Sequence, residues 1–207
     1  MTNPVVLEKP AKAGEQTLNQ KIVTWIQGKM GQKVGDGECW TLAEQALQAS
    51  GGYGSGHYGK ITDDADYEWG TKIKLTEVKA GDILQFRDHV VRTVTKTSIR
   101  FEDQSGWDEE DDQSSTQAHH TAIVKTPADA DGKMAVMDQN SDPGGKIVQN
   151  QALYTRSVAE KTTKEVKSVY DEDAGKKRNA TVITKVTITV TGKLWAYRPQ
   201  AKPEETK

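Results

Sequence analysis

Apolar residues at helical spacing predict two helices in the first quarter of the chain. The first segment, "NQKIVTWIQGKMG", begins at Asn19 and meets a helix-ending glycine at Gly31. The second runs from about Cys39 to Ala49 and gives way to the glycine-rich "SGGYGSGHYG". Both carry an apolar stripe along one face, which is typical of helices packed on a core. The stripe residues are Ile22, Trp25, Ile26 and Met30 in the first helix and Leu42, Ala43, Ala46 and Leu47 in the second.

From Gly81 onward the pattern changes to alternation and short β-branched runs, which predict strands. Turn signals such as "DADGK", "SDPGG" and "DEDAGKK" separate several of them. Helices followed by a series of strands predict an α+β fold, with the helices packed on a curved, mostly antiparallel sheet. The seven candidate strands are "DILQF", "VVRTVTKTSIRF", "HTAIVKT", "KMAVMDQ", "KEVKSVY", "TVITKVTITV" and "KLWAYRP".

A length of 207 residues predicts one domain with its own core, which we place at 17–199. The polar ends, 1–16 and 200–207, are expected to be flexible. The acidic, serine-rich stretch 102–117 is expected to be a solvated loop inserted between two strands, and it lacks the ligand spacing of an EF-hand calcium loop.

Charge and composition exclude several classes of function. The chain has 28 basic and 30 acidic residues, a net charge of −2, so neither nucleic acid nor a membrane surface is expected as a partner. The start of the sequence lacks a secretory signal, which predicts a cytoplasmic protein. No cofactor and no metal site are expected. The pattern specifies no oligomeric state.

Cys39 is the only cysteine, and it stands in the first turn of the second predicted helix. Unpaired backbone N–H groups and the positive end of the helix dipole favour a thiolate at this position. Gly35 and Gly37 allow a sharp turn and a close approach of substrate, and the N–H of Cys39 could then face a developing oxyanion. Taken alone, the segment also fits a small buried cysteine without reactivity.

A catalytic thiolate requires a histidine that accepts and returns its proton. His57 and His89 lie in a glycine-rich loop and a charged turn, and both are expected to be exposed. "HHTAIV" opens an apolar strand, where the period of two places His120 with Ala122 on one face and turns His119 to the other. The small Ala122 leaves room for a helix end, which favours His120 as the base.

The next predicted strand, "KMAVMDQN", brings two candidates for the group that orients the imidazole. Asp138 and Asn140 share one face, and either could bond the far nitrogen of His120. A carboxylate also stabilises an imidazolium, so Asp138 is the better physical choice and Asn140 is second. The alternative is that "DQN" only introduces the turn "SDPGG".

The order of these motifs resembles the papain-like cysteine peptidases and amidases of the CHAP and NlpC type, in which "EQN" stands where this chain has "DQN". A closer resemblance is to the cysteine-proteinase-fold domain at the end of certain fungal actin-patch proteins. That domain shows G-x-G-E-C-W-x-L-A, G-D-I-L-Q-F, H-H-T-A, a Q-N pair and a final Y-R-P in this order, and all five are present here. The resemblance spans about residues 20–200.

This resemblance implies a papain-like fold and a hydrolase with a catalytic triad. It assigns Cys39 as the thiol nucleophile, His120 as the base, and Asp138 or Asn140 as the orienting residue. Asp138 is one methylene shorter than the glutamate of the CHAP group, which strengthens Asn140.

The function so implied is hydrolysis of an amide bond in a peptidoglycan peptide or a protein-derived peptide. Trp40, Tyr53 and Tyr58 are the candidate cleft residues, although Trp40 also fits a core position. The alternative is a catalytically silent domain of the same fold that recognises another protein.

Overall fold

The computed structural model describes residues 15–62, 64–141 and 145–203, and these form two compact units. Of the described residues, those within 15–89, 117–155 and 192–203 belong to the first unit. The second holds Val90–Thr116 and Arg156–Thr191. The predicted single domain therefore corresponds to two compact units, because three of the strands are long enough to contribute residues to both.

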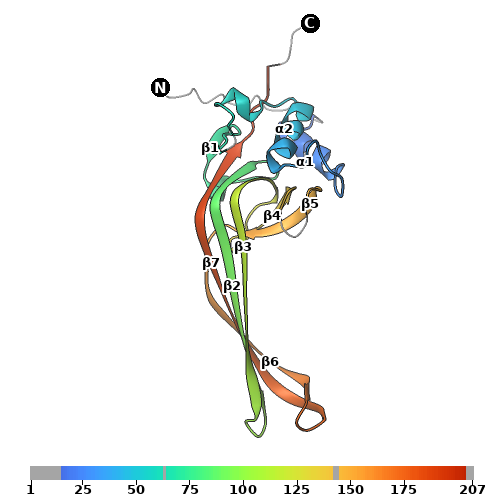
Figure 1. The fold of residues 1–207 in the computed structure, drawn as a ribbon, viewed down its shortest axis with the longest axis vertical. Coiled ribbons are helices and arrows are strands. Elements are labelled where there is room, and N and C mark those ends of the chain that lie inside the picture. Colours follow the sequence, from blue (N-terminus) through green and yellow to red (C-terminus); the bar gives the residue numbers. More distant parts are fainter. Residues whose placement is uncertain (1–14, 63, 142–144, 204–207) are drawn as a thin grey trace. The chain divides into compact units, whose positions relative to one another are not determined.

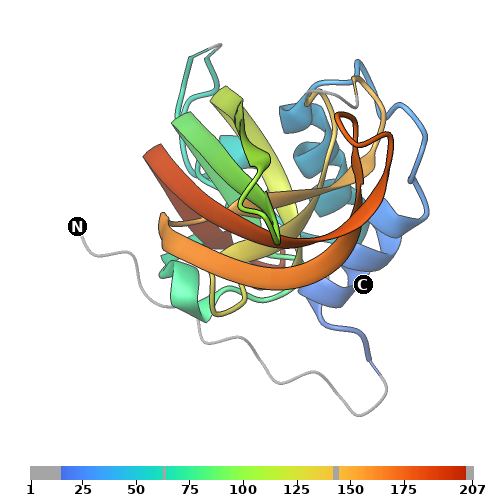
Figure 2. The ribbon, with the colours of Figure 1, turned by 90° about the horizontal axis from the view of Figure 1, so that it is seen from below.

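Both predicted helices are present, and they lie side by side (Figures 1 and 2). Helix α1 spans Leu18–Gln27 and begins with a capping box between Thr17 and Gln20. It ends before Gly28, one turn earlier than the predicted stop. Helix α2 spans Cys39–Ser50 and ends at Gly51, whose φ of 84° gives the left-handed cap that favours glycine.

Seven strands form one sheet in the order β1-β7-β2-β3-β4-β5, with β6 paired to β7, and every register determined for them is antiparallel (Figure 1). The α+β class and the antiparallel sheet are thus confirmed. Two short 3-10 helices, η1 at Ser55–His57 and η2 at Leu75–Glu77, precede the long strands. The strands are β1 Thr71–Ile73, β2 Ile83–Phe101, β3 Gly106–Thr126, β4 Lys133–Asp138, β5 Gln149–Tyr154, β6 Val158–Asp171 and β7 Lys176–Arg198.

The strand count agrees with the prediction, but the segments differ. "DILQF" and "VVRTVTKTSIRF" are parts of the single strand β2, and "TVITKVTITV" and "KLWAYRP" are parts of β7. Strands β1 and β5 were not predicted. β1 has only three residues, and β5, "QNQALY", starts with three polar residues, so neither shows a clear apolar alternation.

Strand alternation divides the core of the first unit between the two faces of its sheet. One face packs against α1 and α2 and includes Ile83, Ile123 and Met137. The neighbouring residues in each strand belong to a second cluster on the other face. That second cluster includes Leu84, Phe86, Ala122, Val124, Met134 and Val136. The face assigned to Ala122 and Val124 by the period of two is therefore confirmed, although α2 packs on the opposite face.

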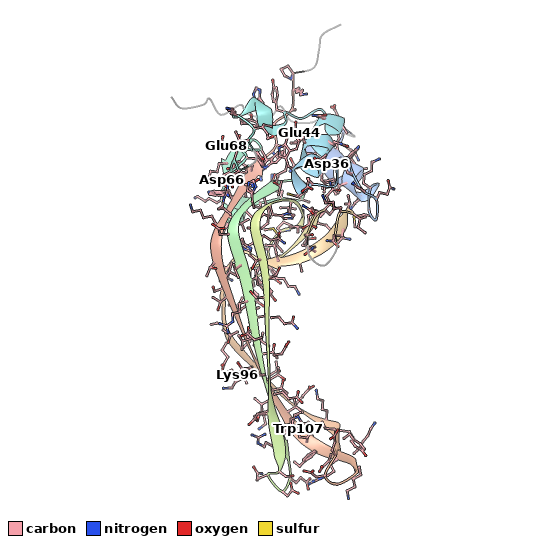
Figure 3. All side chains as sticks on the ribbon, in the orientation of Figure 1. Asp36, Glu44, Asp66, Glu68, Lys96 and Trp107 are labelled. Atoms are coloured by element: carbon pink, nitrogen blue, oxygen red, sulfur yellow. The ribbon has the colours of Figure 1, made fainter. Side chains whose placement is uncertain are left out.

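The second unit corrects the expected acidic loop. Residues from Gly106 onward are part of β3, and only the turn before them lacks strand structure. Asp108 and Asp112 form ion pairs with Arg100 and Arg92 of β2. Acidic residues at alternate positions thus face basic residues of the neighbouring strand, an exposed-strand pattern that resembles a loop in composition. Figure 3 marks Lys96 of β2, which pairs with Glu110 in the same way, and Trp107, which packs on Phe101.

The predicted boundary of the C-terminal tail is also corrected. Ala201 forms a β-bridge with Gly52, and the Lys202 N–H donates to the carbonyl of Gly51. These bonds place the segment against the end of α2, so it is part of the first unit. Residues 1–14 and 204–207, on which most of the flexible-end prediction falls, lie outside the described residues. None of the helices described is long and apolar enough to cross a membrane.

Candidate active site

Cys39 is the first residue of α2, and its half-buried thiol lies next to the turn that leads into the helix. Gly35 and Gly37 adopt positive φ values of 56° and 91°, as the predicted sharp turn requires. A Cβ at Gly35 would come within 2.4 Å of the Thr41 side chain, so the turn packs directly on α2. Glu38, the N-cap residue, makes no side-chain cap bond.

His120 lies in the last third of β3, and Asp138 is the last residue of β4. The imidazole Nε2 of His120 is 2.9 Å from Oδ2 of Asp138, and both side chains are almost completely buried. The Cys39 side chain also lies close enough to the His120 ring to raise its pKa. The structure therefore brings together three of the predicted site residues, although they are far apart in the sequence.

The environment of His120 favours the charged imidazolium. Burial lowers its pKa, but the hydrogen bond with Asp138 and the interactions with the side chain of Cys39 and the charge of Asp138 raise it to about 9. At neutral pH the ring then carries a proton on each nitrogen, and Nε2 donates to Asp138. The Cys39 side chain is the second partner that stabilises this charged ring.

Ser141 holds the second oxygen of Asp138. Its hydroxyl donates to Asp138 Oδ1 at 3.0 Å and accepts a hydrogen bond from Gln149 Nε2 at 2.8 Å. Gln151 of β5 donates to the same hydroxyl. This support fixes the carboxylate that orients His120. Sequence reasoning missed Ser141 because "SDPGG" was interpreted as a turn alone.

Asn140, the alternative orienting residue, is directed elsewhere. Its φ of 60° turns the chain as β4 ends, and its amide donates to the Glu38 carboxylate at 2.6 Å. Of the two candidates, Asp138 is the one that contacts His120. The shorter aspartate reaches the imidazole because His120 and Asp138 occupy neighbouring strands, β3 and β4, which pair directly.

The remaining histidines differ in environment. His119 points away from the site, with Nε2 2.6 Å from the Ala65 carbonyl. His57 is exposed and stacks on Tyr53. His89, expected to be exposed, is instead buried in β2 with its ring edge against Phe86, and this burial lowers its pKa. The prediction was wrong because the strand continues through the apparent charged turn.

The predicted cleft residues lie near one another, and one of them lines a cavity of about 180 Å³. Tyr58 contributes to its wall, and burial raises the pKa of this phenol to about 12. Trp40 packs on the wall residue Tyr67, and its indole N–H donates to Ser55, also in the wall. Tyr53 is not part of the lining. The full lining is Ser55, Tyr58, Gly59, Lys60, Ile61, Ala65, Asp66, Tyr67 and Glu68, of which Figure 3 marks Asp66 and Glu68.

Residues next to Cys39 and His120 in the sequence contact the wall of this cavity. Trp40 follows Cys39, and His119, which precedes His120, lies against Ala65 and Tyr67 of the wall. Within the described part of the chain, no group of three or more His, Cys, Asp or Glu side chains is arranged to hold a metal ion.

Comparison with known proteins identifies the family. Residues 10–203 match the model of the AIM3/BBC1 cysteine proteinase-fold domain. A 99-residue segment is 32% identical to "Altered inheritance of mitochondria protein 3" of Debaryomyces hansenii, covering 42% of this chain and 11% of that protein. No solved structure matches significantly. Since the family model covers nearly the whole chain, the protein belongs to the AIM3/BBC1 cysteine proteinase-fold domain family.

Proposed function

We propose that this domain is a papain-like cysteine peptidase or amidase that hydrolyses an amide bond. The observation that carries the proposal is that Cys39, His120 and Asp138 come together from the start of α2 and from strands β3 and β4, with His120 hydrogen-bonded to Asp138 and its pKa raised by both partners. A thiol at a helix start, a charged imidazole and a buried carboxylate are the three groups that thiol-based acyl transfer requires.

In the proposed reaction the Cys39 thiolate attacks the amide carbonyl carbon. The carbon–nitrogen bond breaks, His120 gives its proton to the leaving amine, and a thioester joins the acyl group to Cys39. Water then attacks the thioester, and His120 accepts the proton of that water as the thiolate is released. Asp138 holds the ring throughout and stabilises its charge.

The substrate we propose is a peptide, derived either from a protein or from peptidoglycan. The cavity beside Trp40 has the volume of a single side chain rather than of an extended ligand. Its wall combines the aromatic rings of Tyr58 and Tyr67 with the carboxylates of Asp66 and Glu68. A side chain next to the scissile bond fits this setting.

The test is a panel of peptide amides and peptidoglycan fragments with product identification by mass spectrometry. The wild type is expected to cleave at least one amide, and Cys39→Ala is expected to abolish that cleavage. Tyr58→Ala is a second variant, expected to raise KM more than it lowers kcat because Tyr58 lines the cavity and is not one of the reacting groups. Hydrolysis that is unchanged in Cys39→Ala contradicts the proposal.

A second candidate function is protein recognition by a catalytically silent domain. The observation that favours it is the burial of His120, whose side chain is only 4% exposed and leaves a substrate little access to the imidazole. A silent domain is expected to retain binding in Cys39→Ala and to show an ordinary thiol. Comparing the alkylation rate of Cys39 with that of a free cysteine peptide separates the two functions.

A further inference from the structure

Gln139 lies between the two candidate orienting residues, and neither the triad nor the cavity uses it. Its side chain is completely buried and makes three hydrogen bonds to the backbone ahead of α2. Its Oε1 accepts from the Val34 N–H at 3.1 Å, and its Nε2 donates to the Val34 carbonyl at 3.0 Å and to the Glu38 carbonyl at 2.7 Å.

The segment that Gln139 binds is the turn that delivers the nucleophile. It runs from Val34 to Glu38, directly before Cys39, and has neither helix nor strand structure. Two glycines with positive φ make it intrinsically adaptable, and the Glu38 side chain does not cap the helix. Within the turn, the Glu38 N–H donates to Asp36 Oδ1 and the Gly37 N–H donates to the Val34 carbonyl. Bonds from Gln139 add to these two in fixing the start of α2.

The position of Gln139 in the fold explains why it can fix both halves of the site. Consecutive residues of an extended chain point in opposite directions, so Asp138 faces His120 while Gln139 faces the turn. One end of β4 thus holds the base and the nucleophile at once. Asn140 and Lys146 add a second anchor by binding the Glu38 carboxylate.

We infer that Gln139 is a positioning residue that holds the turn from Val34 to Glu38, so that the Cys39 thiol stays beside His120. This inference rests on the proposed function. Because a paired thiolate and a free thiol differ in pH dependence, positioning predicts an effect on Cys39 reactivity that a merely structural hydrogen bond would not produce.

The experiment measures the rate of alkylation of Cys39 by iodoacetamide as a function of pH. The chain has a single cysteine, so the rate reports that thiol alone. The variants are Gln139→Glu, which keeps the acceptor but replaces the Nε2 donor, and Gln139→Met, which keeps the length without polar atoms. Gln113→Met makes the same change on a strand of the second unit, outside the site, and serves as the control.

The wild type and the control are expected to react well below the pH at which a free thiol ionises. Both Gln139 variants are expected to shift to the profile of an ordinary thiol, with a rate near pH 6 that is lower by about tenfold or more. Circular dichroism and cooperative urea unfolding establish that each variant is folded. Folded Gln139 variants that keep the wild-type profile overturn the inference but leave the proposed function standing.

Two further outcomes are decisive. A wild type that reacts as an ordinary thiol overturns the proposed function and the inference together. If neither variant folds, hydrogen exchange in the wild type provides the test, because the Val34 amide bonded to Gln139 is expected to be as protected as the amides of β4. Exchange of that amide at the rate of an unbonded loop amide overturns the inference.

Discussion

Replacing Asp138 by asparagine tests how the site keeps His120 charged. The substitution preserves shape but removes the carboxylate that accepts the hydrogen bond from His120 at 2.9 Å. Burial lowers the pKa of His120, and Asp138 and Cys39 are the two groups that raise it. Without the Asp138 carboxylate, only Cys39 opposes the effect of burial. The pKa of His120 is therefore expected to fall from about 9 toward, or below, its ordinary value of 6.5.

The magnitude follows from the size of this shift. Loss of a bonded carboxylate lowers a histidine pKa by about two, which at about pH 8 changes the ratio of charged to neutral ring roughly a hundredfold. The assay is an NMR pH titration of the four histidines, with His120→Gln used to assign the signal. Asp112→Asn makes the same change at an exposed ion pair of the second unit and is expected to leave the His120 titration unaltered.

The same shift predicts a pH dependence of stability. The folded pKa of His120 lies above its ordinary value, so its contribution to the free energy of unfolding is fully present below pH 6.5 and is lost as the pH rises through about 9. The loss amounts to roughly 3 kcal/mol in the wild type, and Asp138→Asn is expected to remove most of it. The free energy of unfolding is measured by urea unfolding at a series of pH values between 6.5 and 9 for the wild type and for Asp138→Asn. If it falls equally with pH in both proteins, or if His120 titrates at the same pH in both, the reasoning is refuted.

Three other substitutions test the framework of the site by urea unfolding. Ser141→Ala removes the hydroxyl that donates to the buried Asp138 carboxylate and is expected to lower the free energy of unfolding by about 1.5–3 kcal/mol. An unchanged free energy of unfolding would show that Ser141 does not support the carboxylate. Gly35→Ala is expected to destabilise more than Gly31→Ala, because both have positive φ but only the first would clash; equal losses contradict this. His89→Leu is expected to reduce the loss of stability as the pH falls below 6.5, because burial lowers the pKa of this imidazole in the folded state. An unchanged acid slope contradicts that account.

The sequence allowed the main parts of the site to be predicted because each has a local signal. Cys39 opens an amphipathic helix after two glycines, and "HHTAIV" shows the period of two. The choice between Asp138 and Asn140 required the structure. Both residues fit the alternation, and only the left-handed turn at Asn140 reveals that its side chain leaves the strand face.

Other features had no local signal. The bonds of Gln139 span about a hundred residues of sequence, so no short pattern around it indicates its partners. The acidic segment of β3 was predicted as a loop because its charges pair with β2 rather than with neighbours in sequence. The burial of His89 likewise depends on the length of β2, which the charged residues around it conceal.

The central claim is that Cys39 is activated by its pairing with His120. Its most direct test is the alkylation rate of Cys39 near pH 6, measured in the native protein and in the same protein unfolded in urea, which provides the same thiol without the site. The native rate is expected to exceed the unfolded rate by about tenfold or more. A native rate equal to or below the unfolded rate contradicts the claim.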